Sequence, residues 1–190
     1  AVKASTGYWI QQANGGPYSG IYIFDGVNSP LRGDSVILNG TVDEFFNSTQ
    51  IENVTAFTNI SFGNSFVITD LAPMAVNDEE YESVMVRIAP NEVKNTSLGF
   101  GEYSIGSGSD TTRVDDFIYS YLLPAVGDSV GITGVVSYSF DNWKILPRDT
   151  NDILEVSVTP PAVLTISAIQ TPFNQDGDSP YDGLTVTTSG

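Results

Sequence analysis

The chain contains no cysteine and no histidine in its 190 residues. Without them it has no thiol nucleophile, no imidazole base, no thiolate zinc site and no Ser-His-Asp triad. Disulfide bonds are excluded too, so stability has to come from the hydrophobic core, with bound ions as the other available source. Several of the commonest catalytic groups are therefore missing.

Basic residues are scarce as well, because 7 Lys and Arg face 23 Asp and Glu, for a net charge of −16. That charge repels phosphate backbones and anionic surfaces at long range, so we expect nucleic acid to be an unfavourable partner. No apolar run approaches the roughly 18 residues of a membrane span, which predicts no membrane insertion. Hydrophobic residues still make up 41% of the chain, enough to build a core.

The hydrophobic residues occur in short runs that are typical of β-strands. Runs such as 20–24, 35–38 and 83–88 are rich in Val, Ile, Tyr and Phe, and are separated by Gly, Asn, Asp, Ser and Pro. Asn39-Gly40 predicts either a hairpin turn or a strand bulge. Only residues 115–122 have a helical pattern. The sequence therefore predicts an all-β fold.

An internal repeat divides the chain. Residues 33–42 read GDSVILNGTV, and residues 127–136, 94 positions later, read GDSVGITGVV. Each copy continues into an aromatic stretch, at 44–46 and 138–140. We interpret the repeat as two tandem β-barrel modules, residues 1–77 and 78–155, joined within a polar, proline-containing stretch.

The pattern changes after residue 155. Pro160-Pro161 disfavours both a helix and a central strand, and a Gly/Asp-rich loop follows. The chain closes with a good strand pattern. Residues 156–190 are therefore predicted to be an extended linker followed by a strand.

The repeated segment is similar to a known type of module. Residues 33–36 leading into 40–45 and 49–51 resemble the OB-fold modules of secreted bacterial surface proteins, of the type associated with extracellular nucleases. Residues 81–88 resemble the opening of a second module, and residues 100–103 and 144–153 resemble its later strands. The resemblance covers most of residues 7–153, and implies two OB-like barrels and an extracellular or cell-surface location.

The two chain ends look complementary in this comparison. Residues 179–183 and 186–190 look like the start of a further module, whereas residues 1–11 look like a module whose first strand is incomplete. We expect a strand of Leu184, Thr185, Val186, Thr187 and Thr188 to complete the first barrel of the next copy, head to tail. Successive copies in one giant chain, or a boundary that falls inside a module, are the alternatives.

Residues 174–182 combine several oxygen-bearing side chains on a glycine-containing turn. Asn174, Asp176, Asp178 and Asp182 supply hard oxygen ligands of the kind calcium prefers. The segment does not have a glycine and a final glutamate at the positions where an EF-hand loop has them. An ordinary Asp/Gly turn is the alternative interpretation. Calcium is the one cofactor that the sequence suggests.

Aromatic side chains could form a ligand face around Trp9, Tyr22 and Trp143, although alternating aromatics in short strands are usually core residues or cross-strand pairs.

Asn-x-Ser/Thr sequons make glycans possible attachments. They occur at Asn39, Asn47, Asn53, Asn59 and Asn95. Neither Glu79-Glu80 nor Asp115-Asp116 is spaced for shared acid–base work, because adjacent strand residues face opposite ways. We therefore expect no catalytic residues and no enzyme activity.

The main hypothesis is a structural or adhesive subunit of an extracellular fibre or repetitive surface protein, assembled head to tail by strand complementation. The alternative is a non-catalytic accessory module of a secreted enzyme that binds nucleic acid or a glycan.

Overall fold

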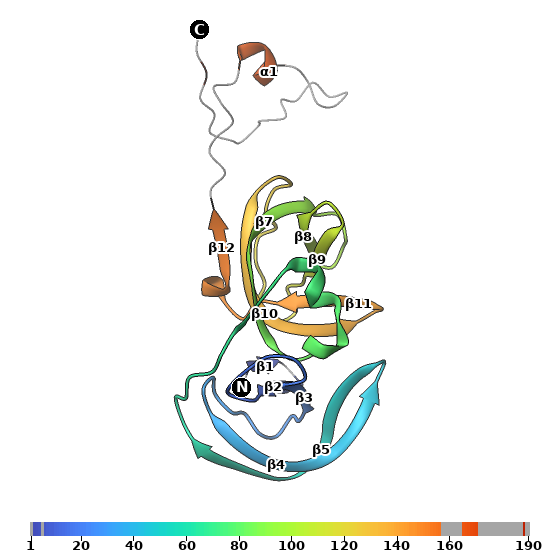
Figure 1. Ribbon diagram of the computed structural model, residues 1–190, viewed down its shortest axis with the longest axis vertical. Helices are drawn as coiled ribbons and strands as arrows, with labels where there is room; N and C mark the ends of the chain where they lie inside the picture. Colours follow the sequence, from blue (N-terminus) through green and yellow to red (C-terminus); the bar gives the residue numbers. More distant parts are fainter. Residues whose placement is uncertain (1, 5, 157–164, 171–187, 189–190) are drawn as a thin grey trace. The chain divides into compact units, whose positions relative to one another are not determined.

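A computed structural model describes residues 2–4, 6–156, 165–170 and 188 (Figure 1). The chain divides into two compact units, Ala1–Val156 and Ser157–Gly190. The first unit consists of β-strands with three short 3-10 helices, so the all-β prediction is confirmed. These helices are η1 (Pro73–Asn77), η2 (Glu79–Tyr81) and η3 (Thr150–Asp152). Within the described residues, no helix is both long and apolar enough to cross a membrane.

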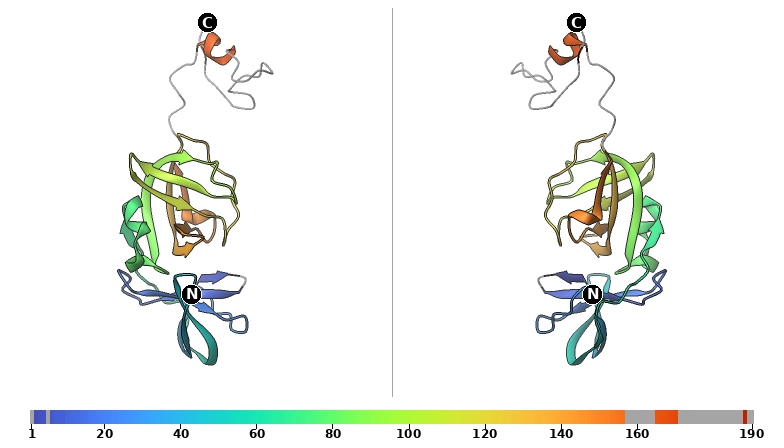
Figure 2. Two further views of the ribbon diagram at one scale, coloured as in Figure 1. Left: turned by 90° about the vertical axis from the view of Figure 1, so that its right-hand side faces the viewer. Right: turned by 90° about the vertical axis from the view of Figure 1, so that its left-hand side faces the viewer.

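The first sheet is built from the N-terminal strands. These are β1 (Val2–Ala4), β2 (Gly7–Gln11), β3 (Gly20–Phe24), β4 (Ser35–Phe45) and β5 (Ser48–Ser61). Their order is β1-β2-β3-β5-β4, and β3 and β5 are the parallel pair. The long β4–β5 hairpin bows beneath β1–β3 (Figures 1 and 2), and residues 45–48 at its turn line a groove together with residues 137–141 of the second sheet.

The second sheet contains the remaining strands of this unit. These are β6 (Thr69–Leu71), β7 (Met85–Asn95), β8 (Tyr103–Ser107), β9 (Asp110–Val114), β10 (Ser129–Ser139), β11 (Asn142–Leu146) and β12 (Ile153–Val156). Their order is β12-β10-β11-β9-β8-β7-β6, and β10 also pairs with β7. The last pairing closes a ring of five strands, β7-β8-β9-β11-β10.

The two sheets repeat one strand order. β1-β2-β3-β5-β4 corresponds to β7-β8-β9-β11-β10, and the parallel pair falls between the third and fifth strands in both. They differ in the first strand. β7 has 11 residues and reaches β10, whereas β1 has 3 residues and, among the described residues, pairs only with β2. The first sheet is therefore an open version of the ring.

The two copies of the repeated motif begin with the same local structure. Gly33 and Gly127 both adopt positive φ, at 86° and 94°. The next residue, Asp34 or Asp128, accepts a hydrogen bond of 2.8 Å from the backbone N–H three residues earlier. Glycine is needed here because a side chain at this φ is strained. The motif thus encodes the turn into the fourth strand of each sheet.

A second glycine of the motif allows the fourth strand to approach the fifth. A Cβ on Gly40 would lie 2.7 Å from the Glu52 carbonyl oxygen, and one on Gly134 would lie 2.5 Å from that of Leu146. The pairing of β4 with β5 shifts between Asn39 and Thr41. The bulge interpretation of Asn39-Gly40 is therefore confirmed.

The hydrophobic core is concentrated in the closed ring. Of the 18 buried hydrophobic residues in the part of the chain that the structure describes, only Tyr8, Trp9 and Ile23 belong to the first sheet. Trp9 packs against Met85, Val135 and Leu146 of the second sheet. The open sheet therefore completes part of its core with side chains from its neighbour.

The helix predicted for residues 115–122 is wrong. The Asp115 carboxylate accepts from the Phe117 N–H at 2.9 Å and from Lys144 Nζ at 2.9 Å. Tyr121 donates to the Gly101 carbonyl at 3.1 Å and packs edge-on against Tyr103. These contacts with distant strands hold the segment in a non-helical path.

Two other features modify the expected organisation. Residues 69–71, at the end of the first predicted module, form β6, which pairs in parallel with β7 of the second sheet. In the second unit, Ile166–Gln170 form the short helix α1, which the sequence did not predict, and the Ile169 N–H donates to the Thr165 carbonyl.

Gly134→Ala should lower the free energy of unfolding by about 1–3 kcal/mol, because the new methyl group cannot fit between β10 and β11 without moving one of them. Equilibrium urea unfolding followed by tryptophan fluorescence measures this effect. Gly26→Ala is the matched control, since a Cβ there meets nothing within 4 Å. Equal stability of the two variants would contradict the close approach at Gly134.

Candidate functional site

The outer edge of β4 is the most unusual feature of the first unit. Among the described residues, β4 pairs only with β5, so its other edge presents backbone N–H and C=O groups without a strand partner. The equivalent strand of the second sheet, β10, pairs with β11 on one side and with β7 on the other. Open edges of this kind are templates for an added strand.

The open edge leaves part of the inward face of β4 uncovered. Val42 is 66% exposed, whereas Val136, its counterpart 94 residues later, is completely buried. Val36 and Leu38 are half-buried, whereas their counterparts Val130 and Ile132 are buried. Covering this face would remove apolar surface from water, which is favourable.

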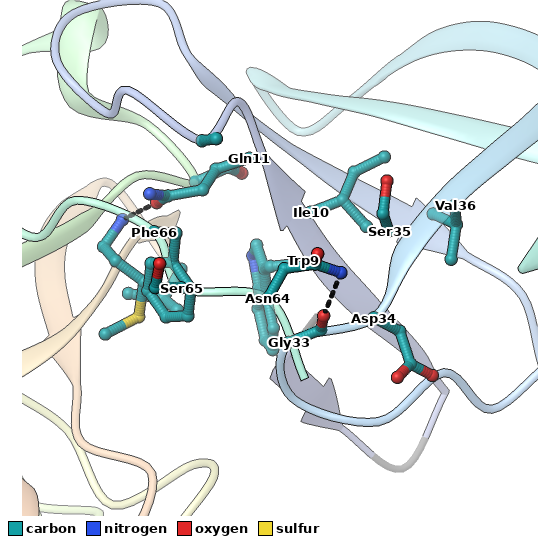
Figure 3. A pocket seen from close by; sticks show the side chains of 14 residues that line it. Trp9, Ile10, Gln11, Gly33, Asp34, Ser35, Val36, Asn64, Ser65 and Phe66 are labelled. Atoms are coloured by element: carbon teal, nitrogen blue, oxygen red, sulfur yellow. Dashed lines mark hydrogen bonds between the residues drawn. The ribbon is translucent and has the colours of Figure 1, made fainter. Parts of the chain in front are cut away.

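A hollow of about 330 Å³ lies between β2 and the start of β4 (Figure 3). Trp9, Ile10 and Gln11 line it from β2, and Ser35 and Val36 line it from β4. In the closed ring of the second sheet, the first strand runs between the corresponding two strands. The hollow therefore lies where a complete first strand would pass.

Hydrogen bonds hold the walls of this hollow in place. Asn64 Nδ2 donates to the Gly33 carbonyl at 2.9 Å, and the Met85 N–H donates to Gln11 Oε1 at 2.8 Å (Figure 3). Gln11 Nε2 also donates to the Val67 carbonyl at 2.8 Å. The side chain of Gln11 therefore connects β2 to the second sheet.

A buried carboxylate lies where the two sheets meet. Glu82 Oε2 accepts from the Thr49 N–H at 3.0 Å, and Oε1 has no hydrogen-bond partner among the described residues. Burial raises the pKa of the Glu82 carboxyl above its ordinary value, although the Ser48 side chain and the Thr49 N–H oppose this rise. The charged form of Glu82 is therefore less favourable in the folded protein than in the unfolded chain.

A second candidate site is an aromatic groove of about 650 Å³. Trp9 and Tyr22, which are cross-strand partners with ring centroids 4.8 Å apart, line it together with Phe46 and Phe140. The two phenylalanines occupy equivalent hairpin turns, and both have positive φ. Each is the last residue of an aligned aromatic stretch of the repeat, 44–46 or 138–140.

Trp143, the third residue of the predicted ligand face, does not line this groove. Its ring pairs with Tyr138 across β10 and β11, at 4.8 Å between centroids, and packs against the core of the second sheet. Tyr138 does line the groove. The structure thus brings Trp9 and Tyr22 together but places Trp143 in a cross-strand pair.

A charged network lines a neighbouring hollow of about 520 Å³. Lys144 Nζ donates to Glu102 Oε1 and Asp115 Oδ2, and Arg113 donates to Glu102 Oε2 at 3.0 Å. Burial alone would lower the pKa of Lys144, but the hydrogen bonds and charges of Glu102 and Asp115 raise it overall. Lys144 is therefore a paired cation, which does not suit it for nucleophilic chemistry.

Several predicted residues lie outside the described residues. They are the calcium ligands Asn174, Asp176, Asp178 and Asp182, and the assembly residues Leu184, Thr185, Val186 and Thr187. Thr188 is described as a single exposed bridge residue. In the part of the chain that the structure covers, no three acidic side chains gather closely enough to hold a metal ion.

The asparagines of all five sequons are exposed, four of them on the β4–β5 hairpin.

No protein-family model and no curated protein matches the chain. The candidate sites are therefore defined by their geometry.

Glu82→Gln should raise the free energy of unfolding at pH 7 by about 1–3 kcal/mol, because the amide keeps the acceptor for Thr49 without a desolvated charge. The folded protein binds the Glu82 proton more tightly than the unfolded chain, so the stability that this proton contributes is present below pH 4.5 and is lost as the pH rises through the folded-state pKa. The difference between variant and parent should therefore grow from acidic to neutral pH.

Urea unfolding of the parent and of the Glu82→Gln variant between pH 4 and pH 8 measures this difference in the free energy of unfolding. The other carboxylates titrate in both proteins, so their contribution cancels in the difference. Glu92→Gln, which alters an exposed pair with Lys94, is the control and should change stability little at any pH. A Glu82→Gln variant that is less stable than its parent at pH 7 would contradict the assignment.

Proposed function

We propose that this chain is a structural subunit of an extracellular fibre, and that the open edge of β4 receives residues 184–188 of another copy. One observation carries the proposal: among the described residues, β4 has no strand on the edge along which its counterpart β10 is paired with β7. Strand addition to such an edge supplies backbone hydrogen bonds and covers side chains on one face.

The topology supports two tandem OB-like barrels as the architecture behind this function. A five-stranded barrel of the OB type is a partly open Greek-key barrel. The second sheet closes such a ring, and the first sheet repeats its strand order without the closing pair. In this proposal the first barrel becomes complete only on assembly.

The charge distribution favours pairing between copies of this acidic chain. With a net charge of −16, two copies repel one another over most of their surfaces. Residues 35–42 on the receiving strand and residues 183–190 on the donated segment contain no charged residue. The two segments can therefore approach without a local electrostatic penalty.

The geometry of the contact favours an open polymer. The donating surface and the receiving surface lie on different parts of the chain, so each copy can donate to one neighbour and receive from another. Head-to-tail contacts of this kind continue into a filament unless their rotation closes a ring.

Deletion of residues 184–190 should abolish assembly, because it removes the donated strand and leaves the receiving edge intact. Light scattering after gel filtration should show a concentration-dependent mass for the parent and about 20.4 kDa or less for the deletion variant. A variant with the same seven residues in scrambled order controls for chain length. Continued growth of the deletion variant into filaments would sink the proposal.

The aromatic groove supports a second candidate function, the binding of a glycan by an accessory module. Phe46 and Phe140 are exposed at 79% and 90%, next to the Trp9–Tyr22 pair. Exposed aromatic rings in a groove offer apolar faces on which a sugar ring can stack. The acidic charge of the chain favours a neutral glycan over a nucleic acid.

Phe46→Ala should weaken binding of a neutral oligosaccharide at least several-fold if the groove is a glycan site. Phe100→Ala is the matched control, because Phe100 is 94% exposed but lines the neighbouring hollow and not the groove. Titration calorimetry against a panel of oligosaccharides measures the difference. Equal binding by both variants, or none by the parent, would exclude this candidate.

A further inference from the structure

The C-terminal segment has an internal counterpart in the described part of the chain. Residues 181–188 read YDGLTVTT, and residues 81–88, 100 positions earlier, read YESVMVRI. Both begin with tyrosine and an acidic residue, and both place apolar side chains at the fourth and sixth positions. Residues 83–88 lead into and begin β7, the strand that closes the second ring.

The pairing of this counterpart with β10 is known in detail. The Ser83 N–H donates to the Val136 carbonyl at 2.8 Å, and the Val136 N–H donates to the Val84 carbonyl at 3.0 Å. Val86 then lies opposite Gly134, and Ile88 lies opposite Ile132. Val84, Val86 and Ile88 are all buried inside the ring.

We infer that the donated strand pairs with β4 in this same register. The inference rests on the proposed function. Each β7 residue is replaced by the residue 100 positions later in the donated strand, and each β10 residue by the residue 94 positions earlier in β4. The β7–β10 pairs and the hydrogen bonds at Val84 and Val136 then define the partners. The resulting pairs are Leu184 with Val42, Thr185 with Thr41, Val186 with Gly40, Thr187 with Asn39, and Thr188 with Leu38.

The side chains suit this register. Successive strand residues point to opposite faces, so Leu184 and Val186 face inward while Thr185 and Thr187 face solvent. Inward-facing Leu184 would cover Val42, which is 66% exposed in the described unit. A slip by one residue would turn both apolar side chains to the solvent, so the register is strongly specified.

Two glycines fit the same arrangement. Gly40 has no side chain opposite Val186, as Gly134 has none opposite the fully buried Val86. Gly183 stands at the position of Ser83, which adopts a positive φ of 63°. Glycine adopts this conformation with less strain than serine, so the donated segment can enter the sheet through the same turn.

Disulfide mapping tests the register without background, because the chain has no cysteine. Thr187→Cys combined with Asn39→Cys places two thiols at directly opposite positions, where Cβ atoms are about 4.5–5.5 Å apart. Oxidised assemblies of this double variant should run as a ladder of covalent multimers on a non-reducing gel. Thr187→Cys with Thr41→Cys is the matched control, in which the thiols are two residues out of register.

The expected result is at least a tenfold higher cross-linked fraction for the 187–39 pair than for the 187–41 pair. Filaments that cross-link at 187–41 instead would overturn the register and leave strand addition standing. A 187–39 disulfide formed within monomers would support the register but overturn assembly between copies. Failure of the parent protein to assemble at any concentration would overturn the proposed function and the inference together.

Discussion

The pairing of backbone hydrogen-bonding groups along β4 in the first sheet and along β10 in the second determines the rest of this structure. A strand whose outer edge is paired covers its inward side chains, and a strand whose edge is open leaves them in contact with water. β7 pairs with β10 and closes one ring, and 15 of the 18 hydrophobic residues that are buried within the described ranges lie between residues 76 and 146. β4 has no such partner among the described residues, and the first sheet buries only three. Core size therefore follows from closure, although both sheets are built from the same repeated motif.

The incomplete sheet depends on its neighbour for order. Trp9 is buried mainly by Met85, Val135 and Leu146, which all belong to the second sheet. Gln11 bonds to the backbone of Met85 and Val67, and Thr49 bonds to the buried carboxylate of Glu82. These contacts fix β2 and the start of β5 and do not involve the outer edge of β4. The same arrangement that stabilises the open sheet thus leaves its receiving edge accessible.

The sequence predicted features that depend on residue pattern and repeat, and it did not predict contacts between segments that are remote along the chain. The β class followed from short apolar runs, and the sequence narrowed Asn39-Gly40 to a hairpin turn or a bulge, of which the structure has the bulge. The segment 115–122 looked helical because its spacing is a local property, but its partners Lys144, Tyr103 and Gly101 are remote in sequence. The sequence likewise did not indicate that Lys144 is buried between Glu102 and Asp115. Trp143 looked like a ligand residue because sequence does not distinguish an exposed ring from one in a cross-strand pair.

The difference between the closed ring and the open sheet also explains how strongly a donated strand has to bind. β7 closes its ring within one chain, so its pairing with β10 costs no translational or rotational freedom of a second molecule. A strand from another copy loses translational and rotational freedom as well, so each correct hydrogen bond and each buried side chain counts for more. Residues 35–42 of the receiving strand meet this requirement, because they carry no charge and include the exposed Val42 and the half-buried Leu38. A register defined by alternating apolar and threonine residues adds specificity, because a one-residue slip loses the burial while retaining the backbone bonds.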